Sequence, residues 1–193
     1  MRMSDNRERF WKLLEPEYVG AMMFCRKLTV DRERGDDLFQ DALLLAYTRI
    51  WTLRDEAAFR PWLYRIIINA FRSQTRRPLW RRMVPMTPDI EVSLAGEDPA
   101  AAYTARRWLQ QAFRVLSPRD QALVTLHELQ GWPVVELAQL LNTTEGAVKA
   151  RLFRCRARLR RVLEAGLTAA ARQTAAAQTI GEKSCAVTKP GSD

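Results

Sequence analysis

Apolar residues recur at spacings of three and four along most of the chain, and no clean alternation of apolar and polar residues appears. This period is that of an amphipathic helix and predicts an all-α protein. An acidic, proline-containing stretch divides the chain, with three helices expected before it and four after it. The expected helices are about Arg7–Leu28, Asp36–Leu53 and Pro61–Arg77, then Ala105–Leu116, one that starts at Ser117 and ends at Gly131, Val134–Leu141 and Thr144–Glu164, with a turn at Asp31–Gly35 after the first.

The dividing stretch, Met83–Thr104, has the composition of a linker. It contains prolines and acidic residues and has no lysine or arginine, which is typical of an acidic flexible connection. We therefore expect two small helical domains, at 1–82 and 105–165, on either side of a linker at 83–104. Residues 166–193 are mostly small or polar and lack an apolar period, so we expect a disordered tail there.

The charge of the chain predicts an anionic partner. Lysine and arginine number 31 against 22 aspartate and glutamate, which gives a net charge of +9 and a pI of about 10.1. The excess is concentrated in two tracts that hold no acid, from Arg60 to Arg82 and from Lys149 to Arg161. Two separate anion-binding surfaces are therefore expected, one in each domain.

Few residues suit metal binding or catalysis. Cys25, Cys155 and Cys185 are widely spaced, form no C-x-x-C pair and are accompanied by one histidine, His127, so a metal site and a disulfide framework are disfavoured. No clustered carboxylates lie beside the basic tracts, and we expect no enzyme activity, no cofactor and no metal. No apolar stretch is long enough for a membrane span and the amphipathic N-terminus is unlike a signal peptide, so the sequence predicts a cytoplasmic protein.

The second expected helix, Asp36–Leu53, has a core face and a second face of mixed character. Acids and an amide lie on that second face beside apolar groups that a solvent-facing surface does not need, and this mixture is typical of a helix that docks on another protein. The alternative is that Leu44 and Trp51 pack against the N-terminal helix. We call this face the acidic stripe; it comprises Asp37, Gln40, Asp41, Leu44, Thr48 and Trp51.

The third expected helix presents a basic face opposite its apolar stripe. Arginines can hold phosphates, an asparagine can bind a base edge and a tryptophan can stack on an unpaired base, so this face suits single-stranded or locally opened nucleic acid. The alternative is a solvated surface with Trp62 packed into the core. The basic face comprises Trp62, Arg65, Asn69, Arg72, Ser73 and Arg76.

The last two expected helices are separated only by Asn142 and Thr143, which predicts a helix-turn-helix. The N-terminal end of the second helix would enter a DNA major groove, with Glu145 accepting from cytosine and Lys149 donating to guanine or to a phosphate. The alternative is a solvated, arginine-rich terminal helix. The candidate recognition residues are Thr144, Glu145, Gly146, Lys149, Ala150, Arg151, Phe153 and Arg154.

In order and spacing, these motifs resemble the bacterial extracytoplasmic-function sigma factors over about Glu8–Arg77 and Arg106–Leu163. Asp36-Asp37-Leu38-Phe39-Gln40-Asp41 is similar to the segment with which that family binds the clamp helices of RNA polymerase. Phe59–Ile66 with Asn69 resembles the stretch that melts and recognises the minus-ten promoter element. Gly146–Leu152 resembles the helix that recognises the minus-thirty-five element.

The resemblance implies a sigma-2-like domain at 1–82 and a sigma-4-like domain at 105–165. Such a chain is an alternative sigma factor that binds core RNA polymerase, directs promoter-specific initiation and leaves the chemistry to the polymerase. The resemblance also implies promoter DNA and an anti-sigma factor as partners. The competing interpretation is a free-standing helix-turn-helix transcriptional regulator, which would leave the acidic stripe and the basic face without a role.

Overall fold

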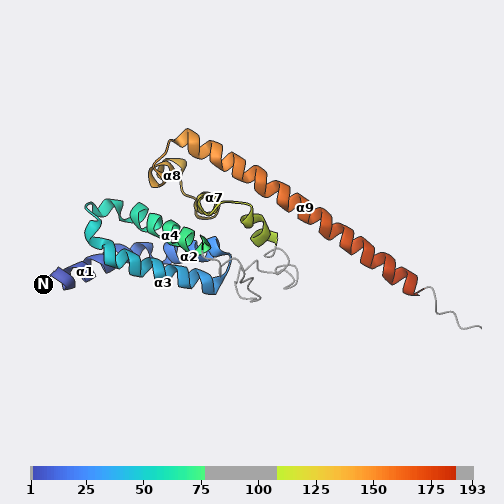
Figure 1. The fold of residues 1–193 in the computed structure, drawn as a ribbon, viewed down its shortest axis with the longest axis horizontal. Coiled ribbons are helices and arrows are strands. Elements are labelled where there is room, and N and C mark those ends of the chain that lie inside the picture. Colours follow the sequence, from blue (N-terminus) through green and yellow to red (C-terminus); the bar gives the residue numbers. More distant parts are fainter. Residues whose placement is uncertain (1, 77–107, 186–193) are drawn as a thin grey trace, which may run out of the picture.

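The computed structural model describes residues 2–76 and 108–185. Within these two ranges every regular element is a helix (Figure 1), which confirms the prediction of an all-α protein. The expected linker at 83–104 lies outside the described residues, as do residues 186–193.

The first expected helix, Arg7–Leu28, is broken in two. Pro16 lies in the middle of this segment, and because proline has no backbone N–H it interrupts the hydrogen-bond ladder of a helix. A short 3-10 turn at this proline joins the two parts. They are α1 (Arg2–Leu14), η1 (Glu15–Glu17) and α2 (Tyr18–Thr29).

The turn after α2 is tighter than expected. Val30 adopts the left-handed backbone region with a φ of 54°, and Asp31 caps the next helix by accepting a hydrogen bond from the Arg34 backbone N–H at 2.9 Å. The predicted turn at Asp31–Gly35 is therefore wrong beyond Asp31, and Gly35 lies inside the helix. A Cβ on Gly35 would lie 2.5 Å from Arg26 Cα, so the crossing of the two helices requires glycine here. This helix is α3 (Arg32–Arg49), followed by η2 (Ile50–Thr52).

The fourth α-helix of the first half, α4, completes its core. A 3-10 turn capped by Asp55 leads into it. The helix packs against α3, and its Tyr64 ring contacts that of Phe24 on α2. Leu63 and Ile67 on its apolar stripe are fully buried. The elements are η3 (Glu56–Ala58) and α4 (Phe59–Arg76).

The second half begins with helical residues 108–114. Ser117 then caps the following helix by accepting from the Asp120 backbone N–H at 3.2 Å, and Gly131, with a φ of 70°, marks the end of that segment as predicted. Asn142, also left-handed, forms the turn of the predicted helix pair. The elements are α7 (Pro118–Val124), a π-helical turn η4 (Thr125–Leu129), α8 (Val134–Leu141) and α9 (Glu145–Cys185).

The final helix α9 is much longer than expected and projects from the body of the molecule (Figure 1). We predicted its end near Glu164 and a disordered tail from residue 166, and this is wrong up to Cys185. Alanine has the highest helix propensity, and extending an existing helix avoids the cost of nucleation, so an apolar period is not needed there. The helix still lies against the body at Gly166, since a Cβ there would lie 2.5 Å from the Trp108 ring.

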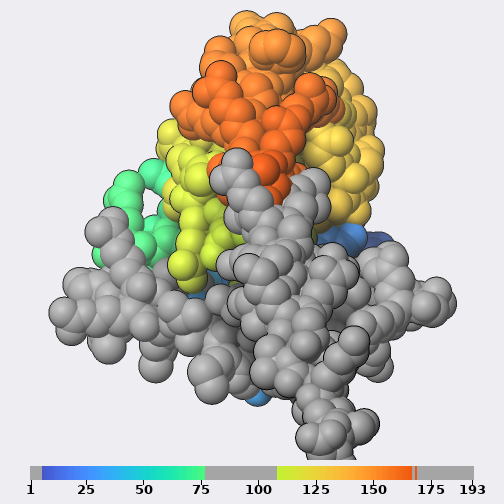
Figure 2. Space-filling model, turned by 90° about the vertical axis from the view of Figure 1, so that its right-hand side faces the viewer, coloured from blue at the N-terminus to red at the C-terminus, as the bar shows by residue number. Residues whose placement is uncertain are grey.

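The two halves pack against each other along α4. α7 and α8 lie against this helix, and η4 lies against α2. Buried residues of both halves form one continuous cluster, in which the Tyr64 and Trp132 rings are 4.6 Å apart. Viewed from the end of the molecule, the elements of the second half form one body with the first part of α9 (orange) lying over it (Figure 2).

Candidate polymerase and nucleic-acid surfaces

The acidic stripe is exposed along its whole length on α3 and η2. Leu44 is 66% exposed and Trp51 is 73% exposed, so the alternative that these two side chains pack against the N-terminal helix is wrong. The Trp51 indole donates to the Thr48 carbonyl oxygen at 3.1 Å, which fixes its orientation. Asp41 accepts a hydrogen bond from Gln74 Nε2 at 2.9 Å. The stripe therefore combines a held aromatic ring with carboxylates, all open to a partner.

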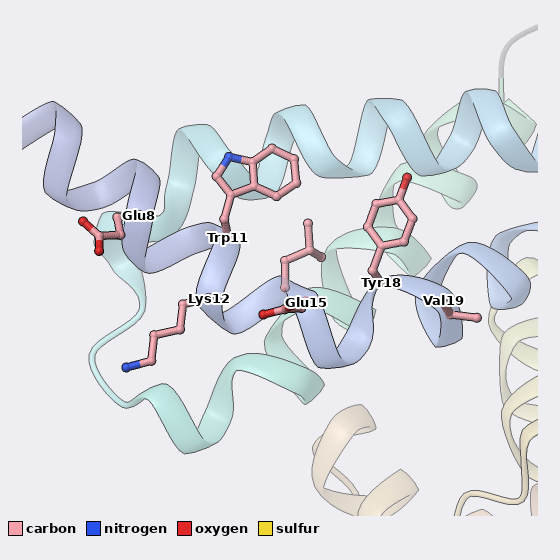
Figure 3. Close-up of a pocket in the computed structure, with 7 residues that line it drawn as sticks. Glu8, Trp11, Lys12, Glu15, Tyr18 and Val19 are labelled. Atoms are coloured by element: carbon pink, nitrogen blue, oxygen red, sulfur yellow. The ribbon is translucent and has the colours of Figure 1, made fainter.

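An apolar groove between α1 and α3 borders the stripe. The sequence pattern does not indicate this groove, because aromatic residues on an amphipathic helix have the pattern of core residues. Trp11 is half exposed and lies between this groove and a second one on α1 and α2, shown in Figure 3. The first groove is lined by Arg7, Phe10, Trp11, Gln40, Leu43, Leu44 and Tyr47.

The basic face of α4 is partly held by its own neighbours. Trp62 is half-buried, with its ring 5.7 Å from that of Phe59, so it is both a core contact and a partly open aromatic surface. Asn69 is exposed, and its Oδ1 accepts from Arg72 Nη1 at 3.3 Å. The remaining exposed residues of this face are Arg65, Ser73 and Arg76.

The helix α8 lies over the beginning of this face. Arg65 Nε lies 3.3 Å from the Leu140 carbonyl oxygen, and its Nη2 lies 3.4 Å from that of Gln139. These carbonyls belong to the last turn of α8, where a cation satisfies free acceptors and opposes the helix dipole. Arg65 therefore caps α8 in this arrangement.

A second arginine on α4, Arg60, lies in the joint between the halves. Its guanidinium carbon lies 4.1 Å from the centroid of the Trp132 ring, and it forms ion pairs with Glu136 at 3.3 Å and with Glu17 at 3.5 Å. Burial raises the pKa of Glu17, and Arg60 opposes that shift. The sequence placed Arg60 in the basic tract but gave no signal of its partners, because they lie far away along the chain.

The recognition residues lie on the first turns of α9, and all but one are exposed. Thr144 caps the helix by accepting from the Ala147 backbone N–H at 3.2 Å. Lys149 Nζ is 3.8 Å from Glu145 Oε2, a weak contact that leaves both side chains open to solvent. Phe153 is 73% exposed, an unusual position for a large aromatic side chain.

The exception among the recognition residues is Arg151, which forms an ion pair with the buried Asp120 of α7. The Ser117 hydroxyl also donates to Asp120 Oδ2, at 2.7 Å. Burial by itself would raise the pKa of Asp120, but the hydrogen bonds from Ser117 and Arg151 lower it below its usual range. Arg151 thus ties the recognition helix to α7, a role that the spacing along α9 does not distinguish from DNA contact.

The thiols and the histidine have structural surroundings. Cys25 and Cys155 are buried; burial raises the pKa of Cys155 to about 11 and also raises that of Cys25. His127 Nδ1 lies 2.9 Å from the Trp132 carbonyl oxygen. Among the described residues, no group of histidines, cysteines and carboxylates is arranged to hold a metal ion, and no helix is long and apolar enough to cross a membrane.

Both halves of the chain match one class of protein. Residues 20–82 match the family model described as "Sigma-70 region 2", and residues 106–159 match that described as "Sigma-70, region 4". The chain is 35% identical over 161 residues to the ECF RNA polymerase sigma factor SigM of Mycobacterium tuberculosis, covering 83% of this chain and 80% of the relative. It is 32% identical over 143 residues to the RNA polymerase sigma-E factor of Streptomyces coelicolor, covering 73% and 78%.

Two solved structures share the fold. One is CnrH in complex with the cytosolic domain of CnrY, with a TM-score of 0.60, 24% identity, and coverage of 84% of this chain and 92% of that chain. The other is the sigma factor RpoE in complex with the anti-sigma factor NepR from Bartonella quintana, with a TM-score of 0.57, 23% identity, and coverage of 80% and 96%.

The chain belongs to the extracytoplasmic-function family of RNA polymerase sigma factors. This family consists of alternative sigma factors, which direct promoter-specific transcription initiation and are not enzymes. The resemblance that the sequence motifs predicted is confirmed.

Proposed function

We propose that the chain divides the work of a sigma factor among three separate helical surfaces. The acidic stripe on α3 binds core RNA polymerase, the basic face of α4 binds the minus-ten element, and the recognition residues of α9 bind the minus-thirty-five element. The observation that supports this division most strongly is the exposure of Leu44 and Trp51 beside Asp37 and Asp41. A free-standing helix-turn-helix regulator has no use for such a surface.

The polymerase assignment rests on the chemistry of the stripe. Leu44 and Trp51 present apolar area that a partner can desolvate, and protein interfaces are enriched in such anchors. Asp37 and the other polar groups flank them and would set the orientation of a basic partner helix. The hydrogen bond between Trp51 and Thr48 holds the indole before docking, so little side-chain entropy is lost on binding.

The minus-ten assignment rests on α4. The exposed amide of Asn69 can form hydrogen bonds with a base edge, and the part of the Trp62 ring that is not buried in the core can stack on a base. Arg72 and Arg76 would hold the phosphates of the opened strand. Burial and the nearby Arg119 and Arg76 lower the pKa of Arg72, which is consistent with a local excess of positive charge that an anionic strand would neutralise.

The minus-thirty-five assignment rests on the N-terminal turns of α9. Lys149 can donate to a guanine edge, Gly146 and Ala150 allow the backbone to approach the groove, and Arg154 would hold a phosphate. Arg151 has a different role from the one expected from the sequence. Because it pairs with Asp120, we assign it to positioning the recognition helix and not to DNA contact.

The partners follow from the same proposal. Core RNA polymerase and promoter DNA would be bound in the cytoplasm, where both reside in a bacterium. The structures of two relatives in complex with CnrY and with the anti-sigma factor NepR support an anti-sigma factor as a third partner, whose binding would cover these surfaces.

Run-off transcription with purified core polymerase tests the proposal. Wild-type protein should produce start-site-specific transcripts from promoters of its own genome, and the double variant Gln40→Ala with Asp41→Arg should abolish them. Glu164→Arg makes the same change in net charge at an exposed site of the other half, and this variant should retain transcription.

The double variant should keep its fold. Its circular dichroism spectrum and its binding to minus-thirty-five duplex should be unchanged, because exposed substitutions usually alter stability by about 0.5 kcal/mol. The absence of any specific transcript with wild-type protein would refute the proposal.

A further inference from the structure

The joint between the two halves covers part of the surface that would meet single-stranded DNA. α8 lies along α4, with the Leu140 and Gln139 carbonyl oxygens within hydrogen-bond distance of Arg65. The guanidinium of Arg65 has a fixed number of donors in one plane. Only Nε and Nη2 of Arg65 face the end of α8, and while they do, these two donors are not available to a phosphate or a base of the minus-ten strand.

The joint is held by contacts of a kind that can be broken. Arg60 bridges Glu136 of α8 and Glu17 of the first half, and all three side chains are partly open to water. Lys27 Nζ donates to the Leu129 carbonyl oxygen at 2.9 Å. Exposed ion pairs and hydrogen bonds of this type are individually weak and are screened by salt.

The apolar part of the joint belongs to the core cluster that both halves share, and like charges lie near it. The Tyr64 and Trp132 rings are in contact there, with an interplanar angle of 55°. Arg119 of α7 lies close enough to Arg72 of α4 to lower the pKa of the Arg72 guanidinium, after the larger effect of burial. Closure therefore brings positive charges of both halves together. A ligand that binds only an open form would shift the chain toward that form.

We propose that this closed arrangement is a self-inhibited form of the chain, in which α8 packs against α4 and Arg65 caps α8 with donors that the minus-ten strand would otherwise bind. The inference rests on the proposed function of the basic face. Binding of single-stranded minus-ten DNA and closure of the joint compete for Arg65, so each must weaken the other by the same factor. The recognition residues of α9 other than Arg151 are exposed in the closed form, so binding of minus-thirty-five duplex is not inhibited in this way.

A charge reversal in the full-length chain tests the competition. Glu136→Arg places a positive charge opposite Arg60, while Glu128→Arg makes the same change in net charge and breaks a pair with Arg156 inside the second half. The probe is a fluorescent single strand carrying the non-template minus-ten sequence of a promoter mapped by run-off transcription. Glu136→Arg should bind it at least about fivefold more tightly than Glu128→Arg does, and small-angle X-ray scattering should show a larger radius of gyration for Glu136→Arg alone. An opened Glu136→Arg chain that binds no better than the control would overturn the inference.

A covalent lock gives the converse test and does not depend on the strength of one ion pair. Lys27→Cys and Leu129→Cys, in a Cys185→Ser background, place two reactive thiols across the joint while Cys25 and Cys155 remain buried. Cross-linking with a short bismaleimide should abolish binding of the minus-ten strand and leave binding of minus-thirty-five duplex unchanged. Failure to cross-link, or undiminished strand binding after cross-linking, would overturn self-inhibition. Transcription by the same chain before cross-linking tests the proposed function separately. Start-site-specific transcripts would support that function even if self-inhibition is wrong, and the absence of such transcripts would refute the function.

Discussion

The basic face of α4 and the recognition residues of α9 are both rich in arginine, yet the fold treats them differently. On α4, Arg65 faces the last turn of α8 and Trp62 is half-buried. On α9, Lys149 and Phe153 are open to solvent. The arginine content of the sequence therefore predicts a binding surface on each helix. It does not predict how accessible each surface is, because that depends on the neighbouring helix that packs against it.

The largest expected effect is on the stability of the recognition helix. Asp120→Asn should lower the free energy of unfolding by about 2–3 kcal/mol, because it weakens hydrogen bonds to a charged group that Ser117 and Arg151 both make. Glu128→Gln is the matched control, since its pair with Arg156 is exposed and should contribute at most about 1 kcal/mol. Urea unfolding of both variants at neutral pH measures the difference. Equal small losses would show that Arg151 is free to serve as a DNA contact.

The same carboxylate gives a pH dependence with a definite sign. The pKa of Asp120 in the folded chain lies below its ordinary value of 3.8, so the ionised carboxylate stabilises the folded chain above that value. This contribution is lost as the pH falls from 3.8 through the folded pKa. The stability difference between wild type and Asp120→Asn should therefore shrink in acid, as measured by urea unfolding at a series of pH values. A difference that persists below the folded pKa would contradict the assignment.

The next largest effect separates packing from DNA contact on α4. Trp62→Ala should cost about 2 kcal/mol of stability, because half of a large ring is removed from the core, and it should also impair promoter opening. Asn69→Ala should impair opening with a stability change within about 0.5 kcal/mol, since this side chain is exposed. Thermal melting and permanganate detection of opened promoter DNA measure the two effects. Normal opening by the folded fraction of both variants would remove α4 from the minus-ten assignment.

On α9 the corresponding prediction distinguishes base contacts from phosphate contacts. Lys149→Ala should weaken binding of cognate duplex by roughly 1–3 kcal/mol while changing binding of unrelated DNA less. Arg154→Ala should weaken both alike and reduce the slope of log affinity against log salt by about one. Fluorescence anisotropy over a series of salt concentrations measures both. A salt-independent affinity of the wild-type chain would contradict DNA recognition by this face.

Local features of the fold were predictable from the sequence, and long-range ones were not. The bounds of α8 and the turn at Asn142 follow from a short apolar period and a residue that tolerates the left-handed conformation. Pro16 lies at the break between α1 and α2, but the apolar period continues through it, so periodicity alone predicts a single helix. The ion pair of Arg151 with Asp120 joins residues far apart along the chain, and so does the hydrogen bond of Arg65 to the last turn of α8. Periodicity contains no information about such contacts.

The acidic stripe and the groove beside it show the same limit within one surface. The exposed apolar residues of α3 could be identified because they lie on the helix face opposite the core stripe. Trp11 and Tyr47 line the groove from the same faces that pack against the core, and Phe10 and Tyr47 are in ring contact with a centroid separation of 5.5 Å. A side chain that packs on one side and lines a groove on the other has the sequence pattern of a core residue alone.

The smallest expected effect concerns the projecting part of α9, where the sequence predicted disorder and the structure has a helix. Deleting Thr168–Asp193 should change the free energy of unfolding by less than about 0.5 kcal/mol and leave duplex binding intact, because Gly166 forms the last close contact with the body among the residues whose side chains are described. Gly166→Leu is the matched variant: its side chain would collide with Trp108, so it should lower the melting temperature although the tail is complete. Helicity measured by far-ultraviolet circular dichroism should fall in the deletion variant, because helical residues are removed. Cooperative melting should remain, since an alanine-rich extension is helical only because it continues an existing helix. A large drop in melting temperature for the deletion, with little change for Gly166→Leu, would reverse the argument and place a stabilising contact beyond residue 168.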